Sequence, residues 1–441
     1  MDLSRRTFLA AQGATLGALL LPGSLLSAVE AATPAPPNLD DWAKVRAQFR
    51  LSRDYLHFAG FFIASHPEPV RAALEGFRTV IDENPFLAVE QRLFESEAQN
   101  IERRICEDIA AYLGGRPEEI ALTGNTTMGL ALVYHGLPLK PGDEILTSTH
   151  DHVVHHESIR LSALRSGVSV RKVTLFEEAA TATVEGIVAR VRAAIRPATR
   201  VLGLTWVHSA TGIRLPIRRI ADVVQEVNRT RAEADHLLFV VDGVHGIGAV
   251  EDSIAQLGCD FFSAGTHKWM FAPRGTGILW APARNWARLR PLIPTFSDRE
   301  SYNAWAENRP VQGPTNAARM TPGGFHAFEH QWAMAAAFRM HAKIGPARVA
   351  DRVFELNDRC RRGLAALPKV KLHTPLSREL SAGINCFEVA GHSPAAVVKA
   401  LLEKRIVAST SPYAVTYARL SAGLMNTPDE VDRAVAEVAR L

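Results

Sequence analysis

"SAGTHKWMFAPRGTG", residues 263–277, places Lys268 directly after a histidine and ahead of a glycine-rich turn. The residues before it, CDFFSAG (259–265), are mostly apolar and predict a buried strand. Lys268 therefore follows the end of a buried strand, where the charge of an ammonium group is expensive to desolvate. On its own, the stretch predicts either a lysine in a buried ion pair or an amine held in a pocket for chemistry.

Outward from this stretch, short apolar runs alternate with helical patterns. This alternation predicts an α/β fold with an open, largely parallel sheet flanked by helices, and 441 residues can bury a large core. We expect an N-terminal arm (32–65), a large domain (66–300) and a smaller C-terminal α+β domain (301–441). The predicted strands of the large domain are 120–124, 144–149, 169–175, 201–207, 236–242, 260–265 and 277–281.

Polar side chains follow the ends of five predicted strands, which is where open parallel sheets bind ligands. Asp242 and Lys268 lie one strand–helix–strand unit apart, so a right-handed crossover places both on one edge of the sheet. Thr126 and Thr127 begin a helical run and suit a phosphate group, although a simple helix cap explains them as well. A structural ion pair between Asp242 and Lys268 is the alternative at this edge.

Together these residues match the three functional groups of pyridoxal 5′-phosphate (PLP). Lys268 would form a Schiff base with the aldehyde, and Asp242 would keep the pyridine nitrogen protonated, which makes the ring an electron sink. Thr126 and Thr127 would bind the phosphate. The sequence therefore predicts a PLP enzyme that acts on an amino acid.

The chain also resembles the class V aminotransferase family of fold-type I PLP enzymes. The resemblance rests on Asp242-x-x-His245, on DFFSAGTHKW (260–269), and on Arg419 in YARLSAGLMNTPDE, and it covers nearly all of the chain after residue 50. Within the family, the HKW…APRG form looks closest to the isopenicillin N epimerase-like proteins. The resemblance implies a large PLP-binding domain, a smaller C-terminal domain and a homodimer.

The resemblance also implies roles for individual residues. Lys268 is the Schiff-base lysine, and Arg419 binds the substrate carboxylate. Gly265 stands where relatives often have a phosphate-binding serine. The other implied cofactor contacts are Asp242 at the pyridine nitrogen, His245 beside it, His267, Thr126 and Thr127 at the phosphate, His152 on the ring face, Ser209 near the ring hydroxyl, and Thr321 at a partner subunit's phosphate.

Two alternatives to a PLP enzyme remain open at this point. The histidines of HDHVVHH (150–156) suit zinc, which suggests a periplasmic metallo-hydrolase, although the HxHxDH order of such clusters is not met. A non-catalytic protein that keeps the PLP fold is the other alternative. For a PLP enzyme, epimerization, transamination and elimination all remain possible. Cysteine desulfurization is disfavoured because Cys360 looks helical and Cys386 lies in a strand-like run.

The N-terminus predicts export. Ser4-Arg5-Arg6-Thr7-Phe8-Leu9 precedes an apolar, charge-free run and then small residues, the order of a twin-arginine signal peptide (1–31), although a single membrane anchor would give a similar pattern. We therefore expect recognition by the twin-arginine export machinery, cleavage near Ala31 or Ala32 and a periplasmic protein with no stable membrane anchor. The formal net charge of +4 is too small to indicate a nucleic-acid partner.

Overall fold

The computed structural model describes residues 38–94 and 100–441. The predicted signal peptide and its cleavage site lie outside these residues. Within them, no helix combines the length and the apolar character needed to span a membrane.

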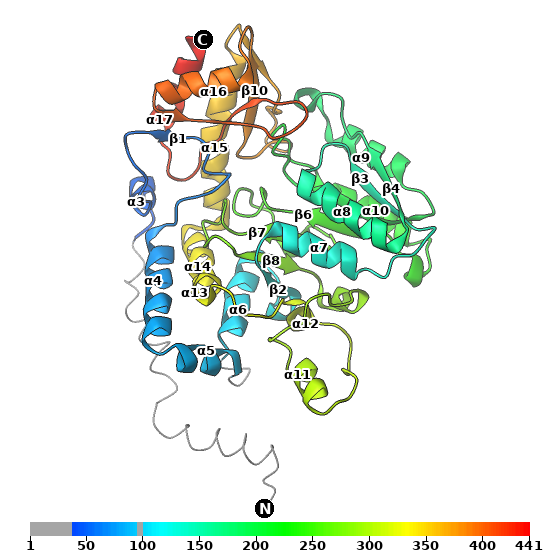
Figure 1. The fold of residues 1–441 in the computed structure, drawn as a ribbon. Coiled ribbons are helices and arrows are strands. Elements are labelled where there is room, and N and C mark those ends of the chain that lie inside the picture. Colours follow the sequence, from blue (N-terminus) through cyan, green and yellow to red (C-terminus); the bar gives the residue numbers. More distant parts are fainter. Residues whose placement is uncertain (1–37, 95–99) are drawn as a thin grey trace, which may run out of the picture.

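A seven-stranded sheet forms the centre of the large domain (Figure 1), with the order β2-β8-β7-β6-β5-β3-β4. Strand β8 is antiparallel to both of its neighbours, and the pairs from β7 through β4 are parallel. All seven predicted strands are present, and the sheet confirms the predicted α/β class. The strands are β2 (Ile120–Thr123), β3 (Glu144–Ser148), β4 (Ser169–Val173), β5 (Thr199–Thr205), β6 (Leu238–Asp242), β7 (Phe261–Gly265) and β8 (Gly277–Trp280).

Helices cover both faces of this sheet because successive side chains of a strand point to opposite faces. Val201 packs in an apolar cluster with α7 and α8, whereas its neighbour Leu202 packs in a larger cluster with α4, α6, α9, α10, α13 and α14. The helices of this domain are α4 (Glu68–Glu83), α5 (Pro85–Phe94), α6 (Ile101–Leu113), α7 (Thr126–Gly136), α8 (Val153–Ser166), α9 (Val184–Ala194), α10 (Ile217–Asn228), α11 (Arg299–Ala306), α12 (Ala317–Met320), α13 (Phe328–Trp332) and α14 (Met334–Ile344).

A second sheet, of four antiparallel strands in the order β12-β13-β10-β9, forms the small domain with α15, α16 and α17. Helices α13 and α14 fall within the range predicted for this domain, yet they pack against α4 and α6 of the large one. Gly345, with a φ of 97°, then separates α14 from α15. The elements are β9 (Val370–Leu372), β10 (Asn385–Val389), β12 (Ser409–Thr410), β13 (Ala418–Leu420), α15 (Pro346–Ala365), α16 (Pro394–Glu403) and α17 (Pro428–Ala439).

The N-terminal arm lies against the small domain. It contains α3 (Trp42–Ala47) and the short strand β1 (Leu56–His57), which pairs in parallel with β11 (Ile406–Val407). Phe58, directly after β1, is fully buried among the apolar residues of the small domain. The arm thus packs against residues that follow it by about 350 positions in the sequence.

Candidate active site

Lys268 lies just beyond the carboxyl end of β7, beside the carboxyl end of β6. Its Nζ is 3.1 Å from Nε2 of His245, and no ion pair joins it to a carboxylate among the residues that the structure describes. Burial, reinforced by the charge of Arg419, lowers the pKa of Lys268 to about 8, although Asp242 opposes the shift. The structural ion pair with Asp242 is therefore not formed, and the arrangement favours a reactive amine.

Asp242 ends β6 and is only 2% exposed. Its Oδ1 accepts one hydrogen bond, from the Val244 N–H at 3.1 Å. Burial, with a smaller contribution from the negative charge of Asp151, raises the pKa of Asp242 to about 6, against the hydrogen bond and the charge of Lys268. A buried carboxyl with so few partners would be stabilised by a cation placed beside it.

The start of α7 lies next to the end of β7. Asn125 caps the helix by accepting a hydrogen bond from the Met128 N–H, and Thr127 is exposed. Thr126 is buried, and its Oγ1 accepts a hydrogen bond from the Gly265 N–H at 2.7 Å. The Thr126 hydroxyl proton and the first N–H groups of the helix remain available to an anion.

Gly265 makes this close approach possible. A Cβ atom at residue 265 would lie 3.2 Å from Oγ1 of Thr126 and 3.0 Å from Cε1 of His267, tighter than ordinary contacts. His267 is half-buried, and burial, with Lys268 nearby, lowers its pKa to about 4, so its ring is neutral. Its Nδ1 has no hydrogen-bond partner among the described residues. A serine at position 265 would crowd these two neighbours.

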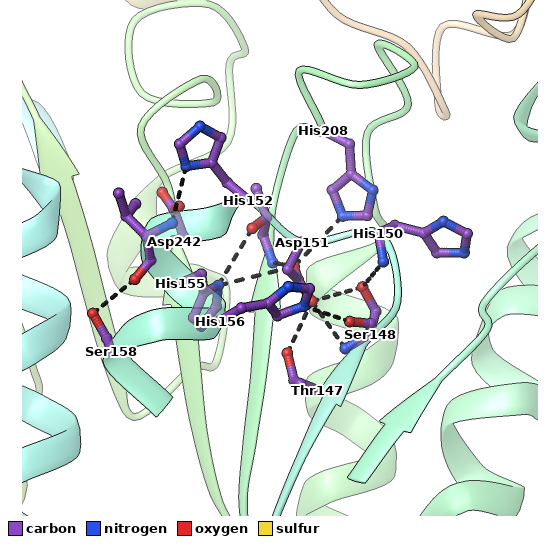
Figure 2. A network of polar contacts seen from close by, with 12 residues as sticks. Thr147, Ser148, His150, Asp151, His152, His155, His156, Ser158, His208 and Asp242 are labelled. Carbon is purple, nitrogen blue, oxygen red and sulfur yellow. Dashed lines mark hydrogen bonds and ion pairs between the residues drawn. The ribbon is translucent and has the colours of Figure 1, made fainter. Parts of the chain in front are cut away.

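The turn from β3 into α8 contains a buried carboxylate that sequence reasoning did not single out (Figure 2). Asp151 is 3% exposed and accepts four hydrogen bonds: from the Thr147 hydroxyl (3.0 Å), the Ser148 N–H (2.9 Å) and hydroxyl (2.6 Å), and the Thr205 N–H (2.7 Å). Burial alone would raise the pKa of Asp151, but nearby His155 and His208 and these hydrogen bonds hold it below its usual range. Asp151 thus ties the ends of β3 and β5 together.

His152 follows Asp151 and caps α8, with its Nδ1 accepting a hydrogen bond from the Val154 N–H at 3.3 Å. Burial, followed by the charges of Lys268 and Arg419, lowers its pKa. His152 also contacts the ring of Tyr413, whose hydroxyl lies 2.9 Å from Ser209, so it belongs to the same group of contacts as Ser209. The expected stacking of His152 on the face of the cofactor ring stays a prediction.

The other histidines of 150–156 each contact a different group of the protein. His150 stacks on Phe176 at 3.9 Å, His155 shares a 2.7 Å hydrogen bond with the Tyr134 hydroxyl, and His156 bonds the Ser148 carbonyl at 2.8 Å. Within 38–94 and 100–441, no three His, Cys, Asp or Glu side chains are arranged to hold a metal ion. The metallo-hydrolase alternative therefore gains no support.

Arg419, in β13, brings the small domain into the site. It is 4% exposed, and its guanidinium donates to Oγ of Ser409 (3.2 Å) and to the carbonyls of Ser209 (2.8 Å) and Thr410 (2.7 Å). None of the described carboxylates forms an ion pair with it. Since a guanidinium has five N–H donors, two remain for an incoming carboxylate.

Ser209 lies between Arg419 and a tyrosine that no motif indicated. Its Oγ is 2.9 Å from the hydroxyl of Tyr413, whose ring also meets His152 edge-on, with 5.9 Å between ring centroids. Thr321, in contrast, is 4% exposed, and its hydroxyl is bonded inside the chain to the Leu122 N–H and the Ala317 carbonyl, both at 3.2 Å. Its predicted contact with a partner subunit, and the homodimer itself, stay predictions.

All four cysteines are enclosed by the protein interior. Cys106, Cys259, Cys360 and Cys386 are free and buried, and burial raises the pKa of each thiol. Cys386 lies inside β10, paired with Arg419 of β13. None of the four is placed to act as an exposed thiolate nucleophile.

The chain is similar in sequence to one family model and to several characterised proteins. The family model described as aminotransferase class-V matches residues 64–434. The isopenicillin N epimerase of Streptomyces clavuligerus is 30% identical over 412 residues, covering 89% of this chain and 96% of that protein. A cysteine desulfurase of Serratia proteamaculans is 25% identical over 364 residues, covering 78% and 84%.

Solved structures show the same fold at lower identity. A C-DES mutant with glycine covalently linked to its PLP cofactor is similar with a TM-score of 0.78 and 21% identity, covering 89% of this chain and 98% of that one. The apo cysteine desulfurase of Thermococcus onnurineus is similar with a TM-score of 0.74 and 19% identity, covering 89% and 96%.

Proposed function

Because the chain belongs to the class V aminotransferase family, we propose that it epimerizes an amino acid, or an amino-acid-containing substrate, at the α-carbon. Its fold is that of the fold-type I PLP enzymes, as the sequence predicted, and its cofactor is PLP. The family membership establishes a PLP-dependent enzyme. The reaction and the substrate class are the proposal.

The residues at the sheet edge fit this cofactor. Lys268 offers an amine of lowered pKa for the aldehyde, and Asp242 offers a buried carboxyl short of partners for the pyridine nitrogen. The start of α7 and the unpartnered Nδ1 of His267 offer donors for the phosphate. When bound, PLP supplies an electron sink that makes the α-proton of an amino acid acidic.

The protein's own groups then bind the substrate and move its proton. The two free N–H groups of Arg419 bind the substrate carboxylate, which fixes the α-carbon relative to the sheet edge. Lys268 takes the α-proton at its Nζ, because its lowered pKa leaves a larger fraction as free amine near neutral pH than an ordinary lysine has. His245 is neutral because burial lowers its pKa well below the usual range, so its Nε2 can accept a hydrogen bond from the Lys268 amine 3.1 Å away and orient it.

One observation carries the proposal: a lysine of lowered pKa and a buried, partner-poor aspartate share a site with a buried arginine that has no carboxylate among the described residues. Epimerization is favoured because the 30% identical epimerase is matched over 96% of its length. Desulfurization is disfavoured because every cysteine is buried with a raised thiol pKa. Transamination, elimination and a cofactor-binding protein without activity are the alternatives that the test below distinguishes.

The test is proton exchange at the α-carbon. The purified protein, with its absorbance band verified, is incubated in deuterated water with single amino acids and short peptides. Mass spectrometry and chiral chromatography then report deuterium uptake and inversion. We expect both for at least one substrate, neither in Lys268→Ala, and both in the surface control Lys399→Ala.

The other outcomes are distinct. Oxo-acid formation would indicate transamination, and release of ammonia with an oxo acid from a substrate that carries a leaving group would indicate elimination. A coloured protein that exchanges no α-proton would be a binder without activity. A colourless protein would contradict the cofactor assignment.

A further inference from the structure

Tyr413 lies on a loop of the small domain that reaches the large one. The loop joins β12 to β13 and is closed at its base, where the Ser411 N–H donates to the Tyr417 carbonyl and the Tyr417 N–H donates to Oγ of Ser411, both at 2.9 Å. In Figure 1 the orange-red chain between α16 and α17 extends towards the large domain. The hydrogen bond between Tyr413 and Ser209 joins the two domains at the site.

The phenol of Tyr413 stays protonated at ordinary pH. Burial raises its pKa, and the negative charges of Asp242 and Asp151 add to this, whereas the hydrogen bond to Ser209 and the charge of Arg419 oppose it. The ring of His152, which meets the tyrosine ring edge-on, has its pKa lowered by burial, in contrast to the phenol. Tyr413 therefore always has a proton to donate.

The direction of the 2.9 Å hydrogen bond follows from acidity. A phenol, with an ordinary pKa near 10, is a better donor than an aliphatic alcohol, so Tyr413 donates to Oγ of Ser209. The proton of Ser209 must then point elsewhere, and none of the described residues accepts it. Ser209 follows β5, whose last residue Thr205 is paired with Asp242, so this free O–H group lies at the same sheet edge as the cofactor residues.

We propose that Tyr413 is a positioning residue that orients the Ser209 hydroxyl to donate a hydrogen bond to the ring oxygen of the bound cofactor. The inference rests on the cofactor assignment above but not on the proposed reaction. Three further contacts hold the pair in place. Arg419 donates hydrogen bonds to the carbonyls of Ser209 and of Thr410, which precedes Tyr413 by three residues. The tyrosine ring also meets the ring of His152 edge-on. The arginine that would bind the substrate and the hydroxyl that would bind the ring oxygen therefore share one set of contacts.

The test is the pH dependence of the cofactor's absorbance band, measured without substrate. A hydrogen bond to the ring oxygen disperses negative charge that helps to hold a proton on the neighbouring Lys268 nitrogen. Losing it raises the pH midpoint of the band, by on the order of one unit for a charge-assisted hydrogen bond. We expect this shift in Tyr413→Phe, which keeps the ring on His152, and in Ser209→Ala, with no further shift in the double variant.

Tyr417→Phe is the matched control, since this tyrosine lies on the same loop but stacks on His373 at 3.9 Å. We expect its midpoint to equal that of the wild type, and thermal melting reports the folding of each variant. An unchanged midpoint in Tyr413→Phe or in Ser209→Ala, or an equal shift in Tyr417→Phe, overturns the inference. A wild-type protein without the band instead overturns the cofactor assignment itself.

Discussion

The ends of β3 and β6 carry two aspartates with nearly equal burial and opposite properties. Asp151 is 3% exposed, accepts four hydrogen bonds and has a lowered pKa, whereas Asp242 is 2% exposed, accepts one and has its pKa raised to about 6. Asp151 lies in the turn after β3 and Asp242 is the last residue of β6, and β5 lies between these two strands. Burial therefore does not decide the role of a carboxylate, whereas the number of its donors does: a saturated one stabilises the fold, and a partner-poor one is suited to bind a cation.

Replacing Asp242 by Asn should have the largest effect. The amide keeps the shape but cannot hold the pyridine nitrogen protonated, so kcat/KM for α-proton exchange should fall roughly 10³-fold. Asp260→Asn is the matched control, since this aspartate lies beside the amino end of β7, at the opposite edge of the sheet, where its carboxylate bonds the Phe239 N–H and Asn285. Equal activity losses in the two variants would contradict the special role of Asp242.

The same variant should not destabilise the cofactor-free protein at neutral pH. Because the folded pKa of Asp242, about 6, exceeds the unfolded value near 4, its ionisation makes the fold less stable as the pH rises from about 4 to about 6. Asn does not ionise, so this loss is absent from Asp242→Asn. Urea unfolding between pH 4 and pH 8 measures this effect. The free energy of unfolding of the variant should rise relative to that of the wild type as the pH increases, by an amount on the order of 3 kcal/mol at pH 8.

Replacing Asp151 by Asn should mainly reduce stability. Each of its carboxylate oxygens accepts a backbone N–H, one from Ser148 and one from Thr205, so either orientation of an amide sets NH₂ against N–H. We expect the free energy of unfolding to fall by about 2–4 kcal/mol. Urea unfolding measures it, with exposed Asp222→Asn as the control; equal losses would refute the contrast. Since the folded pKa of Asp151 is lowered, its contribution is present above pH 4 and is lost in acid.

The smallest effect should come from removing one of the four donors. Thr147→Val keeps the shape of a fully buried side chain and deletes a hydroxyl that donates to Asp151 at 3.0 Å. Oδ2 of Asp151 keeps two other donors, both from Ser148, so the free energy of unfolding should fall by only about 1 kcal/mol. Exposed Thr79→Val should change the same quantity by less than about 0.5 kcal/mol. A loss as large as that of Asp151→Asn would mean that the hydrogen bonds of Asp151 do not act separately.

The sequence predicted most of the large domain because its strands are short apolar runs with clear ends. Lys268 and Asp242 were singled out because each follows or ends a predicted strand, and the carboxyl ends of parallel strands lie along one edge of the sheet. The crossover between their strands is carried by a 3₁₀ turn at Ile254–Gln256 rather than by the expected α-helix, a difference that leaves the two strands adjacent and parallel.

Tyr413 and the hydrogen bonds of Asp151 could not be predicted in this way. Tyr413 reaches Ser209 across 204 residues of sequence, from a loop with no strand or helix pattern of its own. Asp151 is visible in the sequence between two histidines. Its four hydrogen-bond donors, however, belong to two strands, β3 and β5, whose packing the sequence does not show. Local patterns predict elements and their ends, whereas contacts between domains depend on how those elements pack.

The pairing of β1 with β11 has a consequence for synthesis. These strands are about 350 residues apart in the sequence, since Leu56 pairs with Ile406. At ordinary translation rates the arm would wait roughly 20–70 s after emerging before its partner strand exists. About 350 further residues must therefore be synthesised before the arm can dock, and a truncated chain that stops short of β11 would leave the arm undocked and exposed to quality-control proteases.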